Sequence, residues 1–385
     1  MHIQKVHEDE EILKALKEYE RNLATLNITN FTFTVFISAP YMMPNAKAFK
    51  TFFEQHKINV LLPLDEDGKK ERLEESDLLK YIGQYHVALI GDDRYTANII
   101  KLGALSNNKK LIGLMKWGTG IDSIDQDAAN KYGVIIKNTT DAFSEPVAES
   151  ILGSVLSFNR GLFSSTRMMQ DLQSGYSGLK EREKETKAIW VKVPGKTLPE
   201  STFGIIGFGN VGKATAKKLL ALGAKSILTY DILGEIDTSE SKKLENSQNI
   251  CRLSQSKSMN DVLDNNPDFL LVTCSQNKDN IKMIGRKELQ RLNKGKTVLI
   301  NMARGSLIDE SELIKALQGL DGLSLKGAAL DVYWDEPLPV ESPLRVLPNV
   351  VLTSHNANSS PLYWLKVHLN TIKNTFELLS EKVIA

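Results

Sequence analysis

Short apolar runs alternate with longer amphipathic stretches along most of this 385-residue chain. Runs rich in β-branched and aromatic residues predict strands. In the first part of the chain these lie at residues 31–38, 58–62, 87–90, 111–115 and 134–136. Later strands are predicted at residues 203–206, 269–273, 297–301, 327–332 and 350–353. Strand and helix in alternation indicate parallel sheets that are covered by helices on both faces.

Helical patterns mark the two ends of the chain and its middle. Residues 10–26 predict a helix within an N-terminal extension, residues 1–29, and residues 361–379 predict the last helix. A long helix opens near Pro146, with apolar residues at helical spacing. Residues 176–196 carry a run of charges and Trp190. We interpret this segment as a solvated loop or helix face, with a lid or subunit contact as the alternative.

A glycine-rich turn stands between the predicted strand at 203–206 and a helix. Gly207 allows a tight turn, Gly209 lets the backbone approach a pyrophosphate, and Gly212 lets the helix pack closely on the strand. The N-terminus of the following helix offers unpaired N–H groups to an anion. Asp231 comes nineteen positions after Gly212 (231 − 212), where an acid that binds a ribose hydroxyl is expected. Together these features predict a dinucleotide site.

Asp231 also indicates which dinucleotide binds. A carboxylate accepts a hydrogen bond from the 2′-hydroxyl of NAD but repels the 2′-phosphate of NADP. The next residues, Ile232, Leu233 and Gly234, supply no cation. The sequence therefore predicts NAD as the cofactor.

Composition narrows the class of protein. Hydrophobic residues make up 42% and charged residues 25% of the chain, which is typical of a globular protein, and 385 residues suit two domains of ordinary size. A net charge of +1 gives no reason to expect nucleic-acid or membrane partners. Cys251 and Cys274 are far apart and the histidines lack metal-ligand spacing, so we expect no metal and reduced thiols. The N-terminal residues have no apolar segment of the signal-peptide kind, and we expect a cytoplasmic protein.

Three polar residues follow predicted strands of the second half: Arg304, Glu336 and His355. The carboxyl ends of parallel strands share one edge of a sheet, where ligands bind. Arg304 could orient and polarise a 2-oxo acid, and His355 could deliver a proton to the carbonyl as a hydride arrives. Glu336 would pair with His355 and favour its protonated form. Each residue alone has an ordinary alternative, a surface turn, a loop start or a structural histidine; their joint order favours catalysis.

The chain resembles the D-isomer-specific 2-hydroxyacid dehydrogenases. The matching motifs lie at residues 116–125, 146–149, 204–212, 299–310, 327–337 and 352–355. The resemblance implies two Rossmann-like, doubly wound parallel-sheet α/β domains. An NAD domain, residues 143–356, would be inserted into a flavodoxin-like substrate domain formed by residues 1–142 and 357–385. It also implies an NAD-dependent oxidoreductase, a small 2-oxo or 2-hydroxy acid substrate, and a homodimer.

Roles for single residues follow from the same resemblance. Arg304 would be the substrate-orienting cation, Glu336 the partner acid and His355 the acid/base. Asp331 would contact the nicotinamide carboxamide. The predicted cofactor residues are Gly207, Gly209, Asn210, Val211, Gly212, Asp231, Met302, Ala303 and Asp331. Gly118, Thr119 and Gly120 resemble the loop that holds the substrate carboxylate, because glycines expose backbone N–H groups to an anion.

The chain departs from the family pattern beside the predicted histidine. Ser354 precedes His355 where the family usually has proline, and residues 356–358 replace a small apolar residue and a glycine. These differences concern the pocket rim and leave the substrate open. Glu336 argues against formate dehydrogenase, which carries an amide at that position. We expect no serine feedback through a regulatory domain of the kind that follows the catalytic core in some phosphoglycerate dehydrogenases.

Arg94 and Lys116 are further cations near the loops expected to face the substrate. They could hold a phosphate, which makes 3-phosphoglycerate and 3-phosphohydroxypyruvate a candidate substrate pair. Alternatively they are solvated surface charges, and the substrate is another small acid or a larger biosynthetic 2-hydroxy acid. A protein of another class, one that senses NAD and recruits partners with the same fold, is also compatible with these motifs.

Overall fold

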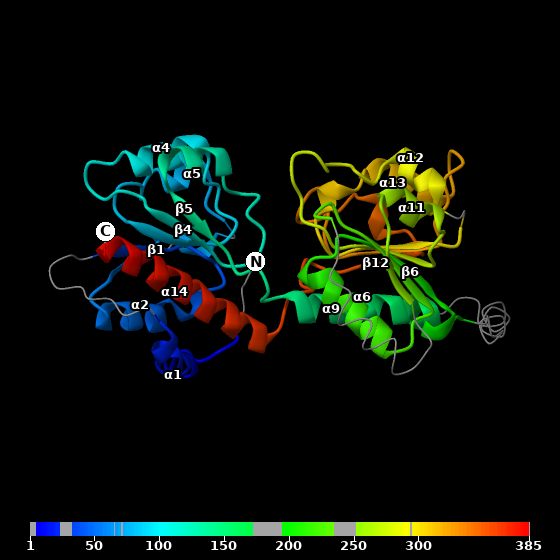
Figure 1. Ribbon diagram of the computed structural model, residues 1–385, viewed down its shortest axis with the longest axis horizontal. Coiled ribbons are helices and arrows are strands. Elements are labelled where there is room, and N and C mark those ends of the chain that lie inside the picture. The colour runs from blue at the N-terminus through cyan, green and yellow to red at the C-terminus, as the bar shows by residue number, and fades with distance from the viewer. Residues whose placement is uncertain are drawn as a thin grey trace. The chain divides into compact units, whose positions relative to one another are not determined.

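The computed structural model describes residues 5–23, 33–64, 66–70, 72–171, 195–234, 252–292 and 295–384. The chain forms two compact units (Figure 1). Unit 1 combines Met1–Phe143 with Ser359–Ala385, and unit 2 is the continuous segment Ser144–Asn358. Nearly all of the charged connection at 176–196, including Trp190, lies outside the described residues.

Unit 1 is built on a parallel sheet. Its strands, among the described residues, are β1 (Thr34–Ile37), β2 (Asn59–Leu61), β3 (Val87–Ile90), β4 (Gly113–Lys116) and β5 (Ile135–Lys137). They lie in the order β2-β1-β3-β4-β5, and every pair is parallel. This is the flavodoxin-like order, in which ligands bind at the carboxyl edge near the β1–β3 switch.

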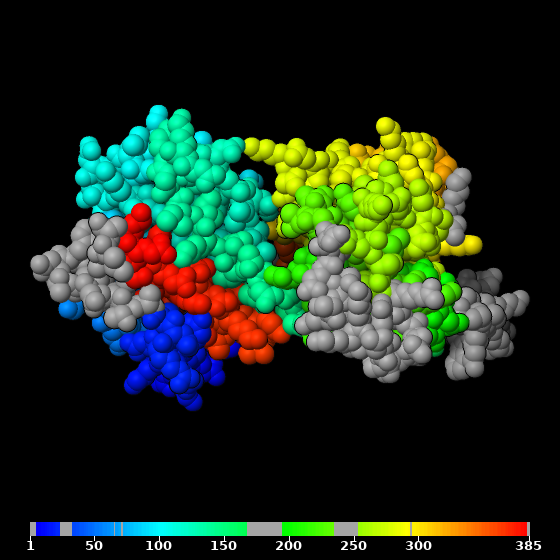
Figure 2. All heavy atoms as spheres, viewed as in Figure 1, coloured from blue at the N-terminus to red at the C-terminus, as the bar shows by residue number. Residues whose placement is uncertain are grey.

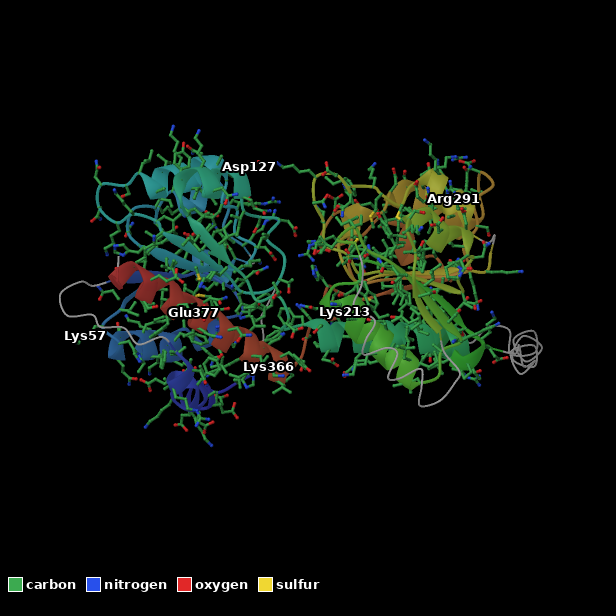
Figure 3. The ribbon with its side chains drawn as sticks, viewed as in Figure 1. Lys57, Asp127, Lys213, Arg291, Lys366 and Glu377 are labelled. Carbon is green, nitrogen blue, oxygen red and sulfur yellow. The ribbon has the colours of Figure 1, made fainter. Side chains whose placement is uncertain are left out.

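Helices on both sides of this sheet come from both ends of the chain. They are α1 (Asp9–Tyr19), α2 (Ala46–Gln55), α3 (Glu75–Leu78), α4 (Ala97–Ala104), α5 (Gln126–Tyr132) and α14 (Pro361–Ile384). Helix α14 packs closely on β4, since a Cβ on Gly113 would stand 2.2 Å from Leu378. Glu377, labelled in Figure 3, pairs with Lys137 of β5 at 3.0 Å.

The N-terminal helix is part of unit 1. Helix α1 ends at Tyr19, earlier than the pattern over 10–26 suggests, and buries Ile12 and Leu16. It packs against α2 and α14, and Figure 2 shows it in dark blue on the surface of this unit. His7 Nε2 lies 2.8 Å from the carbonyl oxygen of Pro361, which ties the start of the chain to the first residue of α14.

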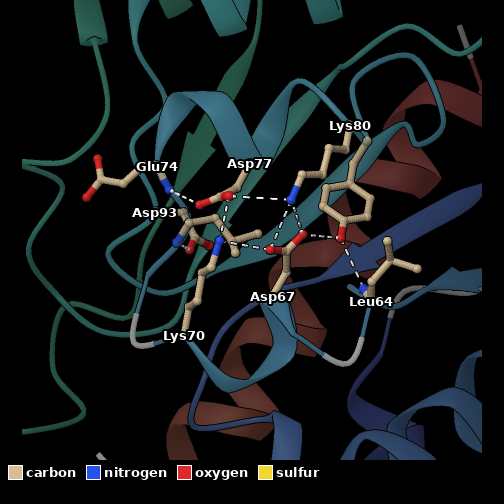
Figure 4. Close-up of polar contacts among 9 residues, drawn as sticks. Leu64, Asp67, Lys70, Glu74, Asp77, Lys80 and Asp93 are labelled. Carbon is tan, nitrogen blue, oxygen red and sulfur yellow. Dashed lines mark hydrogen bonds and ion pairs between the residues drawn. The ribbon is translucent and has the colours of Figure 1, made fainter.

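Charged side chains and one tyrosine form a group of polar contacts in unit 1 (Figure 4). Asp67, only 3% exposed, accepts hydrogen bonds from the Tyr81 hydroxyl at 2.6 Å and from Lys80, and pairs with Lys70 at 2.9 Å. Lys70 also bonds Asp77 at 2.5 Å. We call these five residues the Asp67 cluster. The bonds from Tyr81 and Lys70 outweigh burial and hold the pKa of Asp67 well below its ordinary value.

Unit 2 carries a larger parallel sheet. Its strands, among the described residues, are β6 (Thr202–Ile206), β7 (Ser226–Tyr230), β8 (Arg252–Gln255), β9 (Phe269–Val272), β10 (Val298–Asn301), β11 (Gly327–Leu330) and β12 (Val350–Leu352). Their order is β12-β11-β10-β9-β6-β7-β8. The order reverses between β6 and β9, and this is the switch point where a doubly wound sheet binds its dinucleotide.

The helices of unit 2 pack on this sheet around an apolar core. They are α6 (Ser144–Arg160), α7 (Leu162–Asp171), α9 (Asn210–Ala221), α11 (Met259–Asp264), α12 (Arg286–Arg291) and α13 (Glu310–Gln318). Figure 3 shows Lys213 on α9 and Arg291 at the end of α12. None of the helices in the described ranges is both long and apolar enough to cross a membrane. The two doubly wound α/β units confirm the predicted fold class.

Candidate active site

The glycine turn after β6 shows why each glycine is needed. Gly207 has φ +93°, and a Cβ there would stand 2.4 Å from the backbone of Cys274. A Cβ on Gly212 would stand 2.3 Å from the carbonyl oxygen of Gly207, so α9 can approach the turn only without a side chain. A Cβ on Gly209 would meet nothing within 4 Å. The space beside Gly209, at the N-terminus of α9, therefore suits a pyrophosphate.

Asp231 lies directly after β7, beside this turn. Its carboxylate accepts hydrogen bonds from the amides of Phe208 at 2.6 Å and Leu233 at 2.9 Å. These bonds fix the acid next to the glycine turn, where the ribose of a dinucleotide is expected. The residues present thus fit NAD: an open glycine, a helix N-terminus and an acid at the end of the second strand.

Arg304 follows β10 on a turn that Asn301 ties together. The Asn301 side chain accepts from the amide of Ala303 at 3.1 Å and donates to the carbonyl oxygen of Arg304 at 2.9 Å. Arg304 Nη1 in turn donates to the carbonyl oxygen of Ala303 at 2.8 Å. Met302, Ala303 and Arg304 are half-buried, and they stand in an extended turn rather than in a helix.

Gly305 brings this turn against the loop that follows β11. A Cβ on Gly305 would lie 1.9 Å from the carbonyl oxygen of Tyr333, so the two backbones touch there. In the second loop, the amide of Tyr333 donates to Glu336 Oε1 at 3.0 Å. This bond holds the side chain of Glu336 and leaves Oε2 to accept a second hydrogen bond.

That neighbour is His355. Its Nδ1 lies 2.7 Å from Glu336 Oε2, and the two side chains are 42% and 36% exposed. Burial lowers the pKa of His355, but the hydrogen bond to Glu336 and its charge outweigh this and raise the pKa above its ordinary value. Burial likewise opposes ionisation of Glu336, yet the bond from His355 holds the pKa of that carboxyl below its ordinary value. The positive charge of Arg304 acts on both groups, so the three predicted catalytic residues are close enough to interact.

Asp331, directly after β11, is buried, and both of its carboxylate oxygens accept hydrogen bonds from protein groups. Its oxygens accept bonds from the Thr353 hydroxyl and from the amides of Asn356 and Ala357. Met302, Thr353, Asn356 and Ala357 also line a small pocket against Ser150, Gly153, Ser154 and Ser157 of α6. Asp331 therefore organises the loop that carries His355, a role that its position in the sequence does not reveal.

The predicted carboxylate loop lies on unit 1, after β4. Gly118 has φ +117°, and its amide donates to the Thr139 hydroxyl at 3.1 Å. Thr119 Oγ1 donates to the carbonyl oxygen of Thr139, and Asn138 donates to that of Thr119. The Gly118 amide is thus engaged inside the unit, which leaves the Thr119–Gly120 part of the loop as the candidate anion contact.

The two further cations differ sharply in exposure. Lys116, only 5% exposed in its side chain, donates to the carbonyl oxygen of Gly91 and to Asp92 Oδ1, both at 2.7 Å. Its charge is therefore compensated at close range by a carboxylate. Arg94 is exposed, and its backbone amide bonds Leu73. Both residues belong to unit 1, whereas Arg304, Glu336 and His355 belong to unit 2.

Comparison with known proteins identifies the family. Residues 156–357 match the family model described as D-isomer specific 2-hydroxyacid dehydrogenase, NAD binding domain. The chain belongs to the D-isomer specific 2-hydroxyacid dehydrogenase family. It is 29% identical over 314 residues to a D-3-phosphoglycerate dehydrogenase of Methanocaldococcus jannaschii, covering 81% of this chain and 52% of that protein. The chain thus spans about half the length of this relative.

Two further matches show the breadth of the resemblance. A hydroxypyruvate reductase of Thermotoga maritima is 28% identical over 340 residues, which cover 84% of this chain and 99% of that protein. Among solved structures, a D-lactate dehydrogenase with NAD+ from Lactobacillus jensenii is similar in fold, with a TM-score of 0.62 at 20% identity. That match covers 90% of this chain and 97% of the other.

Family membership confirms the predicted resemblance, the NAD cofactor and the class of NAD-dependent dehydrogenase. Unit 2 contains the whole of the matched NAD-binding segment. Sequence reasoning missed the supporting residues of the site, which are Asn301, Gly305, Tyr333 and Thr353. Asn301 and Thr353 could have been found, because both are polar residues at the carboxyl end of a predicted strand. No group of three or more potential metal ligands occurs in the part of the chain that the structure describes.

Proposed function

We propose that this chain interconverts a small 2-oxo acid and the corresponding D-2-hydroxy acid with NAD(H), and that Arg304, Glu336 and His355 carry the reaction. The observation that supports this most is the 2.7 Å contact between His355 Nδ1 and Glu336 Oε2. It joins the ends of two adjacent strands in the unit that matches the NAD-binding family model.

The Glu336–His355 pair explains how a proton is held for transfer. With Glu336 ionised and His355 protonated, Nδ1–H donates to Glu336 while Nε2 carries the proton that goes to the substrate oxygen. After transfer the ring is neutral and keeps its bond to Glu336. In the oxidative direction Nε2 takes the proton back from the alcohol. The pKa of His355, raised by Glu336, keeps the donor form populated.

Arg304 has the complementary role. Its guanidinium can hold the carboxylate or the polarised carbonyl of a 2-oxo acid through parallel N–H groups. NADH, when bound, supplies the hydride. Gly209, the N-terminus of α9 and Asp231 would hold the dinucleotide, and the Asp231 carboxylate favours NAD over NADP.

Within this proposal, hydroxypyruvate or glyoxylate is favoured over 3-phosphohydroxypyruvate. A phosphate clamp built on Arg94 and Lys116 loses one of its two cations, because Lys116 is buried against Asp92. Relatives named for hydroxypyruvate and glyoxylate reduction are frequent beside those named for phosphoglycerate. Arg94 is exposed and could still contact a phosphate, so the phosphorylated substrate is included in the test.

Steady-state oxidation of NADH with glyoxylate, hydroxypyruvate, pyruvate and 3-phosphohydroxypyruvate tests the proposal. We expect turnover of at least one unphosphorylated acid, and its loss in Arg304→Ala and His355→Ala with NADH affinity retained. Inactivity on all four acids would point to a larger 2-hydroxy acid. Inactivity on a wider panel together with NAD-dependent capture of a partner would support a sensor instead.

The predicted homodimer and cytoplasmic location belong to the proposal as well; the family resemblance supports the homodimer, and the N-terminal sequence is the ground for the location. Light scattering checks the first: a mass twice the 42.9 kDa of the chain supports a dimer. A monomeric mass at micromolar concentration would contradict it.

A further inference from the structure

The loop that carries His355 has an unusual backbone. His355 has φ +53°, in the left-handed region that residues with a side chain rarely adopt. Beyond His355, the amides of Asn356 and Ala357 point to the same side and form a small concavity of successive N–H groups. Such a concavity binds an anion, and here the anion belongs to the protein.

The Asp331 carboxylate fills this concavity. Oδ1 accepts from the amide of Asn356 at 3.0 Å and Oδ2 from that of Ala357 at 2.9 Å. Oδ1 also accepts from the Thr353 hydroxyl at 2.6 Å, on the other side of His355. Asp331 is 2% exposed and its own amide donates to the carbonyl oxygen of Asn301, so the carboxylate has a fixed base in the sheet.

Tyr333 fixes the same loop from a second direction. Its hydroxyl lies 2.5 Å from the carbonyl oxygen of Thr353 and 3.0 Å from that of Leu330, while its amide donates to Glu336. The residues around β11 therefore set the position of both partners in the Glu336–His355 pair.

We propose that Asp331 is a positioning residue: it holds residues 353–357 in the conformation that directs the His355 ring at Glu336. Calling the effect catalytic rests on the proposed function, but the positioning itself does not. This role is distinct from the nicotinamide contact that the family resemblance implies for Asp331. One carboxylate can serve both, because it has about four acceptor positions and the loop uses three.

Thr353 separates positioning from charge. Thr353→Val removes one bond to Asp331 at nearly constant volume and leaves the Asp331 charge in place. Thr353→Ser keeps the hydroxyl and is the matched control. Asp331→Asn is the stronger variant, because an amide places an N–H donor against one of the two loop amides.

The first readout is the pKa of His355, measured by NMR on the chain without substrate and assigned by comparison with His355→Gln. We expect Thr353→Val to lower this pKa by about half a unit, because the ring leaves Glu336 more often. Thr353→Ser should keep the wild-type value. An unchanged pKa in Thr353→Val would overturn the proposal, whether or not any 2-oxo acid is reduced. Asp331→Asn does not decide this readout, because the charge of Asp331 itself raises the pKa of His355.

The second readout is the division of the effect between kcat and KM. For Thr353→Val we expect kcat to fall about tenfold with KM for NADH within about twofold, since positioning affects the proton transfer. Asp331→Asn should lower kcat further. A rise in KM for NADH alone in Asp331→Asn, with a silent Thr353→Val, would mean that Asp331 serves only the cofactor. If Asp331→Asn does not fold, the Thr353 pair of variants still decides.

Discussion

The Asp67 cluster of unit 1 and the Glu336–His355 pair of unit 2 are both built from opposite charges. They differ in how exposed their side chains are and in whether an atom is left for a ligand. Asp67 is 3% exposed and bonded by three side chains (Figure 4). Glu336 and His355 are 36% and 42% exposed. His355 Nε2 makes no hydrogen bond to any residue in the described ranges.

The two groups differ in the way expected of a structural charge group and of the proposed catalytic pair. In the Asp67 cluster the carboxylate of Asp67 is occupied by three side chains. Lys70 bonds both Asp67 and Asp77, so the cluster links the turn at Asp67 to α3. The His355 group is held on one side by Glu336 and Asp331, and the other side of the ring remains available. A catalytic group needs both a fixed orientation and an unused atom.

Replacing His355 should produce the largest effect. We expect His355→Ala to lower kcat/KM for reduction about 1000-fold, because the proton donor is lost. The melting temperature should stay within about 2 °C of wild type, since the side chain is exposed and contributes little to folding. A large loss of stability with retained activity would show that His355 has a structural role, like the residues of the Asp67 cluster, and is not the proton donor.

Asp93, a neighbour of the Asp67 cluster, should make stability depend on pH. Its carboxylate is buried with a hydroxyl and an amide as partners, and burial raises its pKa to about 6. The folded state then binds the proton more tightly than the unfolded state, so this contribution is present below pH 4 and is lost as pH rises through 6. At about 1.4 kcal/mol per pKa unit the loss approaches about 3 kcal/mol.

Urea unfolding of the wild type and Asp93→Asn between pH 4 and 8 measures this contribution. The variant should gain stability relative to wild type as pH rises. A difference that does not vary with pH would show that Asp93 titrates normally.

Removing the centre of the Asp67 cluster should cost stability without affecting chemistry. We expect Asp67→Ala to lower the free energy of unfolding by about 2 kcal/mol, because the buried Tyr81 hydroxyl loses its acceptor. The kcat of the folded fraction should not change. Denaturant titration and steady-state kinetics on the same preparation check both parts. A drop in kcat would contradict the purely structural role of the Asp67 cluster.

Glu336→Gln should give a smaller change that depends on pH. Loss of the carboxylate lowers the pKa of His355, so the alkaline limit of reduction should move to lower pH. At neutral pH we expect about a tenfold loss of kcat/KM. The pH profile is the measurement, and an unmoved alkaline limit would mean that Glu336 does not set the His355 pKa.

Much of the architecture could be predicted from the sequence, because buried parallel strands are short apolar runs. Most predicted strands lie within two residues of those observed. Strand β8, Arg252–Gln255, was missed because it is an edge strand of mostly polar residues. The end of α1 was also wrong, since the helical pattern continues through residues that leave the helix at Tyr19.

The candidate site was predictable in part. Arg304, Glu336 and His355 follow strands, and the parallel order of β10, β11 and β12 brings those ends together. The state of Lys116 was not predictable, because its partner Asp92 lies on the neighbouring strand end, 24 positions away. The internal bonds of Asp331 depend on the backbone of residues 353–357, which no local pattern encodes.

The composition of unit 1 from both ends of the chain has a consequence for synthesis on the ribosome. Helix α14 covers β4 at Gly113, but residues 361–384 are translated after all of unit 2. The ribosome therefore completes unit 2 while the sheet of unit 1 still lacks helix α14. Because domains fold as they emerge, the part of the chain that is made first should be the last to reach its native packing.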